Sequence, residues 1–331
     1  MFLVVDDFDH DGSLDIVVVN SCGDGDCSGP GNIAFLKGDG KGSLALVGSY
    51  GAGHRPNRAA VGDYDEDGSL DVAVTDYNRG VDILLGNGDG SFGRAQSFDV
   101  GAFPTSVVTG DFNHDGHLDL AASNAESMVS ILFGDGQGTF GAAVPYTIKG
   151  PLRMLTAADL NGDGNLDLAA AVGSGSDGRA VVLYGKADGT FPLTSKFHTD
   201  LDAMFVAVGD FNHDHAPDLV SVNFDADDVS ILLNSGGTFV TATSSENPAP
   251  AGQPVTFTAT VAPSLISTIP TGAVQFADGT TILATVPLDQ NGVASYTTSG
   301  LSTGTHTIRT KYSGDSNFNP NMGQPLTQII E

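Results

Sequence analysis

The nine residues DFDHDGSLD, from Asp7 to Asp15, decide the fold, because the pattern that they define, D-x-[DN]-x-D-G-x-x-D, returns along most of the chain. The further copies are DYDEDGSLD from Asp63, DFNHDGHLD from Asp111, DLNGDGNLD from Asp159 and an altered DFNHDHAPD from Asp210. Successive copies start 56, 48, 48 and 51 residues apart. A regular period of this size predicts an array of similar supersecondary units.

Each copy is followed by a Gly-rich turn and flanked by short apolar runs. The turns are GDGKGSL, GNGDGSF, GDGQGTF, GKADGTF and NSGGTF, which end at Leu44, Phe92, Phe140, Phe191 and Phe239. In the third repeat the apolar runs are SVVTG, LDLAASN, MVSILFG and AAVPYTI, all of strand length. Four strands in about 50 residues match a propeller blade, whereas an Ig-like sandwich needs about 100 residues. The chain is therefore predicted to be all-β, with five four-stranded propeller blades in residues 1–243.

The aspartate pattern predicts a calcium site in every blade. Asp or Asn at positions 1, 3 and 5 places side-chain oxygens inside a tight loop, and Gly at position 6 permits a positive φ. The carbonyl group of position 7 then points inward, and Asp at position 9 completes a set of hard oxygen ligands that suits Ca²⁺. The candidate ligands are Asp7, Asp9, Asp11, Ser13, Asp15, Asp63, Asp65, Asp67, Ser69, Asp71, Asp111, Asn113, Asp115, His117, Asp119, Asp159, Asn161, Asp163, Asn165, Asp167, Asp210, Asn212, Asp214, Ala216 and Asp218, for up to five Ca²⁺ ions.

Two details refine this prediction. An EF-hand needs Glu at position 12, but that position is Val18 in the first loop and Val74 in the second. In the fifth loop His215 replaces the glycine, and a positive φ costs His more than Gly, so weaker calcium binding is expected there.

The G-x-G-x-x-G matches at residues 88–93 and 136–141 lie between strands and are interpreted as β-turns, since a dinucleotide site needs a helix after the motif.

The loops and turns together resemble the FG-GAP, or VCBS-type, repeats of integrin α-subunit propellers and of many bacterial surface proteins. The pairs Phe92–Gly93 and Phe140–Gly141 match the motif that names the family, whereas Phe191 and Phe239 are followed by Pro and Val. In that family the calcium loop joins the first two strands of a blade and supports the blade, and seven blades are usual. The five visible blades form either a smaller ring or part of a larger one. No G-x-S-x-G, H-E-x-x-H or pair of catalytic carboxylates stands apart from the calcium pattern, which favours a protein that is not an enzyme.

Residues 244–331 follow another pattern. The Pro-rich stretch SSENPAPAGQP, residues 244–254, precedes strand-length alternations such as PVTFTATVAP, separated by Gly, Pro and Asp turns. A small β-sandwich is predicted here. The segment GTHTIRTKYSGDSNF, Gly304–Phe318, resembles bacterial Ig-like domains, which space or display other domains, and we expect no chemistry in it.

Composition narrows the choice of partners and compartment. The net charge is −27, from 40 acidic and 13 basic residues, which argues against nucleic acid and against anionic membranes as partners. No stretch is apolar and long enough to span a bilayer, and no signal peptide is visible at the start. Cys22 and Cys27 lie close together in a Gly-rich segment, either as a local disulfide or as free thiols. With calcium and a surface-protein resemblance, an extracellular or cell-surface location is expected.

A ligand surface is expected on the face of the blades opposite the calcium loops. In an up-and-down blade the connections alternate between the two ends, so this face receives Gly53–Arg58, Tyr77–Arg79, Lys149, Arg153 and Arg179. Its basic and aromatic content suits a protein or glycan ligand in adhesion or recognition, although an ordinary solvated surface would look similar. The alternatives are a propeller lectin with a sugar in each blade and an accessory region of a larger secreted carbohydrate-active enzyme.

Overall fold

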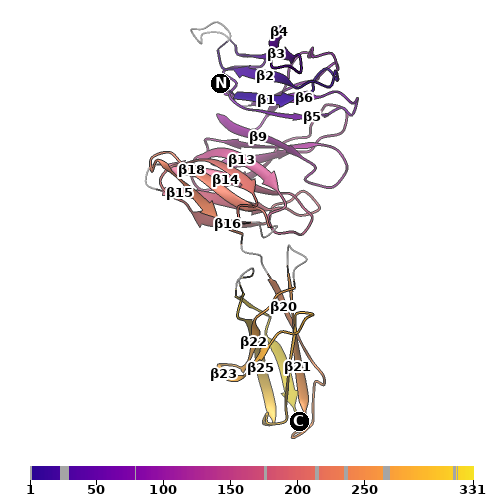
Figure 1. Cartoon of the computed structure of the whole chain (residues 1–331), viewed down its shortest axis with the longest axis vertical. Helices are drawn as coiled ribbons and strands as arrows, with labels where there is room; N and C mark the ends of the chain where they lie inside the picture. Colours follow the sequence, from indigo (N-terminus) through magenta and orange to yellow (C-terminus); the bar gives the residue numbers. More distant parts are fainter. Residues whose placement is uncertain are drawn as a thin grey trace. The chain divides into compact units, whose positions relative to one another are not determined.

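The computed structural model describes residues 2–22, 30–78, 80–174, 177–212, 216–234, 238–263, 269–315, 318 and 320–331. Every named element in this part of the chain is a β-strand (Figure 1). The chain divides into two compact units, of which the first comprises Met1–Asp159, Gly164–Gly209 and Leu219–Leu232 and the second Leu160–Asp163, Asp210–Asp218 and Leu233–Glu331. No helix that could cross a membrane occurs among the described residues.

The first unit contains four four-stranded antiparallel sheets, one for each of the first four repeats. They are β1 (Phe2–Asp6), β2 (Asp15–Asn20), β3 (Asn32–Gly38) and β4 (Leu44–Gly51); β5 (Ala59–Gly62), β6 (Asp71–Asp76), β7 (Gly80–Leu84) and β8 (Gln96–Asp99); β9 (Pro104–Gly110), β10 (Asp119–Asn124), β11 (Met128–Leu132) and β12 (Val144–Thr147); and β13 (Leu152–Ala158), β14 (Asp167–Ser174), β15 (Asp177–Tyr184) and β16 (Leu193–His198). In each sheet the strands are paired in sequence order, which confirms the predicted up-and-down blades.

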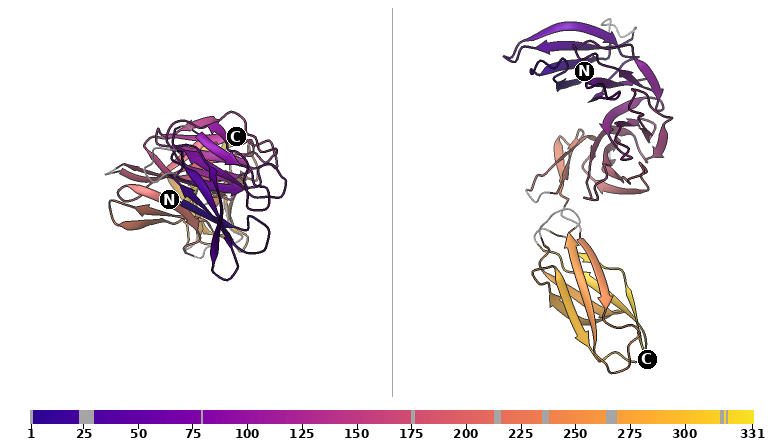
Figure 2. Two further views of the ribbon diagram at one scale, coloured as in Figure 1. Left: turned by 90° about the horizontal axis from the view of Figure 1, so that it is seen from above. Right: turned by 90° about the vertical axis from the view of Figure 1, so that its right-hand side faces the viewer.

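The blades are arranged as in a β-propeller. The first strand of each blade packs beside the first strand of the next, from β1 through β5, β9 and β13 to β17 (Ala203–Gly209). Figure 2 shows the sheets following one another from the indigo first blade to the magenta ones. On the inner side, the guanidinium group of Arg58 lies 5.2 Å from the ring centre of Phe2 on β1 and 5.5 Å from that of Phe205 on β17. One arginine therefore contacts both the first and the fifth blade through cation–π interactions.

Each Gly-rich turn in blades two to four ends in a phenylalanine that packs against the preceding blade. Phe140 is 9% exposed, and its ring centre lies 5.6 Å from that of Tyr64 and 5.3 Å from that of Phe98, both in the second blade. Tyr64 is position 2 of its aspartate loop, and the edge-to-face geometry adds to the burial of apolar area. The equivalent contacts are those of Phe92 with Phe8 and Tyr50 and of Phe191 with Phe112 and Tyr146.

The fifth repeat differs from the prediction of four strands. Its sheet contains β17, β18 (Asp218–Asn223) and β19 (Asp228–Leu232). The chain up to residue 243 was predicted to belong to the fifth blade, but residues 238–244 form β20 (Thr238–Ser244), which pairs with β21 (Val255–Pro263) of the second unit. The predicted boundary at 243/244 is therefore wrong, because Val240 points into the core of the C-terminal sandwich while Phe239 is 63% exposed.

The C-terminal part of the chain forms two antiparallel sheets. One contains β20, β21 and β24 (Val293–Thr298), and the other contains β22 (Ala273–Asp278), β23 (Thr281–Pro287), β25 (Gly304–Tyr312), β26 (Asn321–Met322) and β27 (Leu326–Ile330). Alternate residues of both sheets fill one core, in which Phe257, Phe276 and Tyr312 are fully buried. This arrangement is the β-sandwich that the sequence predicted.

The fifth blade leaves one of its faces exposed to solvent. Ile231 on β19 is 54% exposed, whereas the equivalent residues of the second and third blades, Ile83 and Ile131, are 1% and 0% exposed. Ile83 and Ile131 lie in the core clusters between blades. The face of the fifth blade that carries Ile231 is therefore equivalent to the face that packs against a neighbouring blade in the second and third blades.

The segment with the two cysteines can be followed only in part. Cys22 is disulfide-bonded, and Cys27, the only other cysteine of the chain, lies outside the described residues.

Candidate metal centres in the repeat loops

Every aspartate loop joins the first and second strands of its blade, and the Gly-rich turns lie at the same end. The loop of the second blade, residues 63–71, runs from β5 to β6. A Cβ atom placed on Gly88 of the turn would lie 2.9 Å from the Ser69 hydroxyl oxygen, and one on Gly136 would lie 2.5 Å from Nδ1 of His117. The turns therefore pack directly on the loops, and both features lie on one face of the blades.

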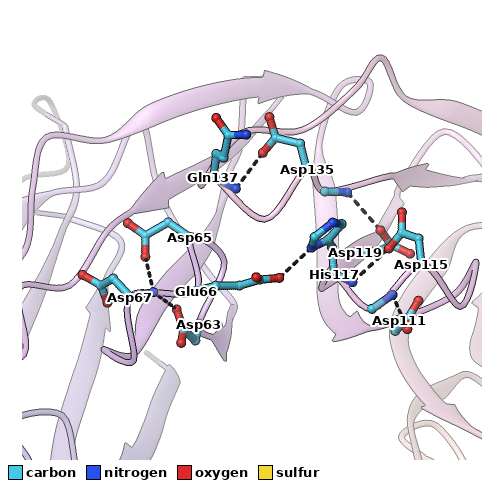
Figure 3. A network of polar contacts seen from close by, with 12 residues as sticks. Asp63, Asp65, Glu66, Asp67, Asp111, Asp115, His117, Asp119, Asp135 and Gln137 are labelled. Carbon is cyan, nitrogen blue, oxygen red and sulfur yellow. Dashed lines mark hydrogen bonds and ion pairs between the residues drawn. The ribbon is translucent and has the colours of Figure 1, made fainter.

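The acidic side chains of a loop turn inward because backbone N–H groups of the same loop donate to them. In the second loop, Gly68 N–H donates to Asp63 Oδ2 over 2.9 Å, and Asp67 N–H donates to Asp63 Oδ1 and Asp65 Oδ1 over 3.1 and 3.3 Å. Ser69 N–H donates to Asp67 Oδ1 over 2.7 Å. Figure 3 shows these side chains around the loop. Positive φ angles of 57° at Glu66 and 89° at Gly68 produce the coil that makes these short-range bonds possible.

The aspartate at position 9 is completely buried in all five loops and has a second role that the sequence analysis missed. Asp71 accepts the N–H of Tyr64 on Oδ2 over 2.7 Å and the N–H of Gly86, at the end of the third strand, on Oδ1 over 2.7 Å. The bond from a residue at the end of the third strand recurs at Asp15, Asp119, Asp167 and Asp218. This carboxylate therefore ties the loop to the third strand, independently of any metal.

The first two loops bring three carboxylates into one cluster. One oxygen atom from each of Asp7, Asp9 and Asp15 lies within 4.8 Å of the other two, and Asp63, Asp65 and Asp71 form the same cluster in the second loop. These are positions 1, 3 and 9. The carboxylate of position 5 is not in either cluster and instead accepts the N–H of position 7.

The electrostatics of the clusters favour a cation. Burial, followed by the charges of Asp67 and Asp63, raises the pKa of Asp65. Burial likewise raises the pKa of Asp71 to about 7 and that of Asp119 in the third loop to about 6, with smaller contributions from neighbouring carboxylates. Because these side chains are held together against their own repulsion, a bound cation would stabilise them.

The third, fourth and fifth loops carry Asn at position 3, so an amide oxygen replaces one carboxylate. In the third loop, Oδ1 of Asp111 at position 1 is buried and accepts no hydrogen bond from the described residues. In the fifth loop Asp214 and His215 lie outside the described residues. Asp218 still accepts the N–H groups of Phe211 and Asn234 over 2.9 and 2.7 Å. The hydrogen bonds of the buried position-9 aspartate are therefore kept although position 6 of this loop is not a glycine.

Neighbouring loops contact each other through side chains at positions 4 and 7. Glu66 of the second loop pairs with Nδ1 of His117 of the third loop over 2.6 Å, as Figure 3 shows. His114 of the third loop lies 3.0 Å from Oδ1 of Asn165 of the fourth. The hydrogen bond to Glu66 raises the pKa of His117. Sequence reasoning treated position 7 only as a carbonyl ligand, although the complementary residue types at positions 4 and 7 of successive copies were visible in the repeat.

The opposite end of the blades exposes an aromatic pair beside an arginine. The rings of Tyr77 and Phe103 lie 4.8 Å apart, and the two residues are 38% and 40% exposed. The guanidinium group of Arg55 lies 5.3 Å from the Tyr77 ring. Tyr77 follows β6, while Arg55 and Phe103 lie in the connections that lead into the second and third blades. Arg79, which was predicted for this face, lies outside the described residues.

Comparison with family models identifies both parts of the chain. A model described as FG-GAP-like repeat matches residues 7–74, 63–122, 115–170 and 159–221, and a model described as bacterial Ig-like domain (group 3) matches residues 241–331. No curated protein matches the chain. Both families are typically non-catalytic, and together they fit a cell-surface or adhesion-type protein. With the blades and loops described above, these matches show that the chain belongs to the FG-GAP-like repeat family and carries a C-terminal bacterial Ig-like domain.

Proposed function

We propose that the protein is a calcium-stabilised adhesion module of the cell surface or the extracellular space. In this proposal the repeat loops hold Ca²⁺, and the opposite face of the blades binds a protein or glycan ligand. The observation that carries the calcium part is the convergence of three carboxylates in each of the first two loops. Such a cluster is costly without a counter-ion and is rich in the oxygen ligands that Ca²⁺ prefers.

The donor set of the loops fits calcium. Positions 1, 3 and 9 supply oxygens only, with no sulfur or imidazole ligand, as a hard cation requires. The buried Oδ1 of Asp111 supports the same assignment for the third loop, because a buried carboxylate oxygen without a hydrogen bond is costly unless another group, such as a cation, neutralises it. In the fourth and fifth loops, Asp159, Asn161, Asp210 and Asn212 would act in the same way.

A calcium titration of the full chain tests this part of the proposal. The protein is stripped with EDTA and dialysed, CaCl₂ is added in steps, and thermal unfolding is followed by circular dichroism, with MgCl₂ as the control ion. We expect the unfolding midpoint to rise with calcium, because a ligand that binds only the folded state stabilises it by about 2.7 kcal/mol per site at a hundredfold excess over Kd. An unchanged midpoint up to millimolar calcium would contradict the calcium assignment.

The ligand part rests on the exposed group of Arg55, Tyr77 and Phe103. Phe103 has a φ of 57° and Arg55 a φ of 52°, and Asp202 at the equivalent place in the fifth repeat also has a φ of 52°, so this conformation is shared by the connections between blades. Exposed aromatic rings beside an arginine are typical of recognition surfaces. The proposed ligand surface is therefore the group formed by these three residues.

Binding to a glycan array and to a protein array tests the ligand surface. A ligand found with the wild type is expected to lose most of its binding to Tyr77→Ala and to Phe103→Ala. Phe211→Ala serves as the matched control, because Phe211 is an aromatic residue that is 45% exposed but lies in an aspartate loop. Equal loss in all three variants, or no loss in the first two, would contradict the assignment.

A lectin with one sugar in each blade is less well supported. Such a lectin needs similar aromatic residues at equivalent positions, but the residues eight positions before the second to fifth loops are Arg55, Phe103, Pro151 and Asp202. The surface therefore differs from blade to blade, which favours a single ligand that spans the connections of the second and third blades.

A further inference from the structure

The first aspartate loop differs from the others in having a lysine beside it. In every repeat, a residue at the end of the third strand donates its N–H to the aspartate at position 9. The residue just before this donor occupies an equivalent position in all five repeats. This residue is Lys37 in the first repeat and Leu85, Phe133, Tyr184 and Leu233 in the others. A lysine at a position that is otherwise apolar or aromatic needs an explanation in its surroundings.

In the other blades the equivalent side chain packs against the next blade. A Cβ atom on Gly138 would touch both Leu85 and the Asp65 side chain, and one on Gly189 would touch both Phe133 and the Asn113 side chain. Leu85 and Phe133 therefore lie between position 3 of their own loop and the turn of the following blade. In the first blade it is Phe35 that packs against the turn of the second blade, because a Cβ atom placed on Gly90 of that turn would overlap the Phe35 ring. Lys37 is thus not needed for packing between the blades.

Lys37 instead reaches into its own loop. Its ammonium group forms ion pairs with Asp9 and, over 2.7 Å, with Asp11. The Asp9 side chain is only 7% exposed, so the interaction is shielded on that side. Asp9 and Asp11 are positions 3 and 5 of the loop, which the sequence predicts as calcium ligands, and Asp9 belongs to the carboxylate cluster of this loop.

We propose that Lys37 acts as a built-in counter-ion that takes the place of calcium in the first loop. The ammonium group pairs with two of the four carboxylates and cancels one of their four negative charges, so the loop keeps its shape without metal and binds Ca²⁺ much more weakly than the second loop does. A calcium ion could enter only after Lys37 swings out, or against the repulsion of a positive charge within a few ångströms, which we expect to weaken binding by about tenfold or more. This inference rests on the proposed calcium binding of the other loops.

Calcium stoichiometry and affinity of the full chain test the inference, with Ca²⁺ alone as the probe. Isothermal titration is carried out on the EDTA-stripped wild type and on Lys37→Leu, which restores the residue of the second repeat. Lys41→Leu is the matched control, because it removes the same charge from an exposed position in the turn of the same blade. We expect Lys37→Leu to gain one site, or to tighten one site about tenfold, while Lys41→Leu binds like the wild type.

A second measurement, the unfolding temperature in EDTA, does not depend on the number of calcium sites in the wild type. In EDTA, Lys37→Leu is expected to unfold at a lower temperature than the wild type and than Lys41→Leu, since the carboxylates of the first loop lose their counter-ion. With calcium the difference disappears. The reciprocal variant Leu85→Lys is expected to lose one site if it folds.

Identical calcium binding and identical EDTA midpoints for wild type and Lys37→Leu overturn the inference, even where the wild type binds calcium and the proposed function stands. Absence of calcium binding in both proteins overturns the proposed function as well. A gain of one site in Lys37→Leu alone supports the inference.

Discussion

At the scale of the residue, the aspartate at position 9 is the most constrained side chain of the repeat. Its two oxygens accept N–H groups from the loop and from the end of the third strand, and its exposure is 0% in every copy. The same carboxylate also belongs to the carboxylate cluster of the first two loops. In the proposed function, one residue of each repeat therefore both closes the blade and offers an oxygen to calcium.

Replacement of Asp71 by Ala is expected to cost about 3 kcal/mol of unfolding free energy, because it leaves the N–H groups of Tyr64 and Gly86 buried without acceptors. The loss persists in EDTA, since the two bonds do not depend on metal. Chemical denaturation of the metal-free protein measures it. Asp225→Ala, at an exposed position, is the control and is expected to change stability by less than about 0.5 kcal/mol. A loss seen only with calcium would show that Asp71 acts through the metal alone.

The raised pKa values of the position-9 aspartates predict a pH dependence whose sign calcium reverses. The folded pKa is about 7 for Asp71 and about 6 for Asp119, above the unfolded value of about 3.9. Between these limits the folded state holds protons that the unfolded state has released. The metal-free protein therefore loses stability as the pH rises through this window.

Calcium requires the ionised carboxylates, so its stabilising effect is expected to grow as the pH rises. The measurement is the unfolding midpoint in EDTA and in calcium between about pH 5 and about pH 7.5. Midpoints that rise with pH in EDTA would contradict the assignment of protons to these buried carboxyl groups.

At the scale of the element, the phenylalanine that ends the Gly-rich turn of blades two to four joins neighbouring blades. Phe140 extends from the third blade to Tyr64 and Phe98 of the second, and the same contacts recur at Phe92 and Phe191. The turn thus supplies the side chain that fills the space between two sheets. Because position 2 of the loop provides the other ring, the loop and the turn stabilise one interface.

Phe140→Ala is expected to destabilise the first unit by about 3–4 kcal/mol, since a large buried aromatic side chain leaves a cavity. Phe239→Ala is the matched control, because Phe239 ends the fifth turn but is 63% exposed, and we expect a cost below about 1 kcal/mol. Urea unfolding of both variants in saturating calcium compares them. Equal losses would contradict the role of the turn phenylalanine between blades.

At the scale of the whole molecule, the repeats and the C-terminal sandwich are expected to respond differently to calcium. The candidate metal ligands lie in the repeat loops, and the C-terminal sandwich is built around an apolar core. Calorimetry of the full chain is expected to show two transitions, of which the one assigned to the repeats moves to higher temperature with calcium. A calcium shift of equal size in both transitions would contradict this separation.

Much of this organisation was predictable from sequence because it is local. The loops, the turns and the strands of the first four blades follow from residue patterns within a few positions of each other. The role of Asp71 toward Gly86 was not predictable, because it depends on the register of three strands. The assignment of residues 238–244 failed for a related reason, since their alternation fits either a blade or a sandwich and only the partner strand decides. Lys37 was visible as an exception in the repeat, but its contact with Asp9 needed the structure.

The side chains that join one loop to the next make the order of the repeats matter. The second and third loops meet as glutamate and histidine, and the third and fourth as histidine and asparagine. The fourth and fifth loops carry Gly162 and Ala216 at the same positions, two residues without a polar side chain. If a copy of the third repeat were inserted after itself, His114 would face a second His117, and a pair of imidazoles would stand where His114 now meets Asn165. The blades are similar in sequence but differ in the side chains that join one loop to the next. Permuting or duplicating the blades is therefore expected to disrupt the contacts between loops before it disrupts the folding of a single blade.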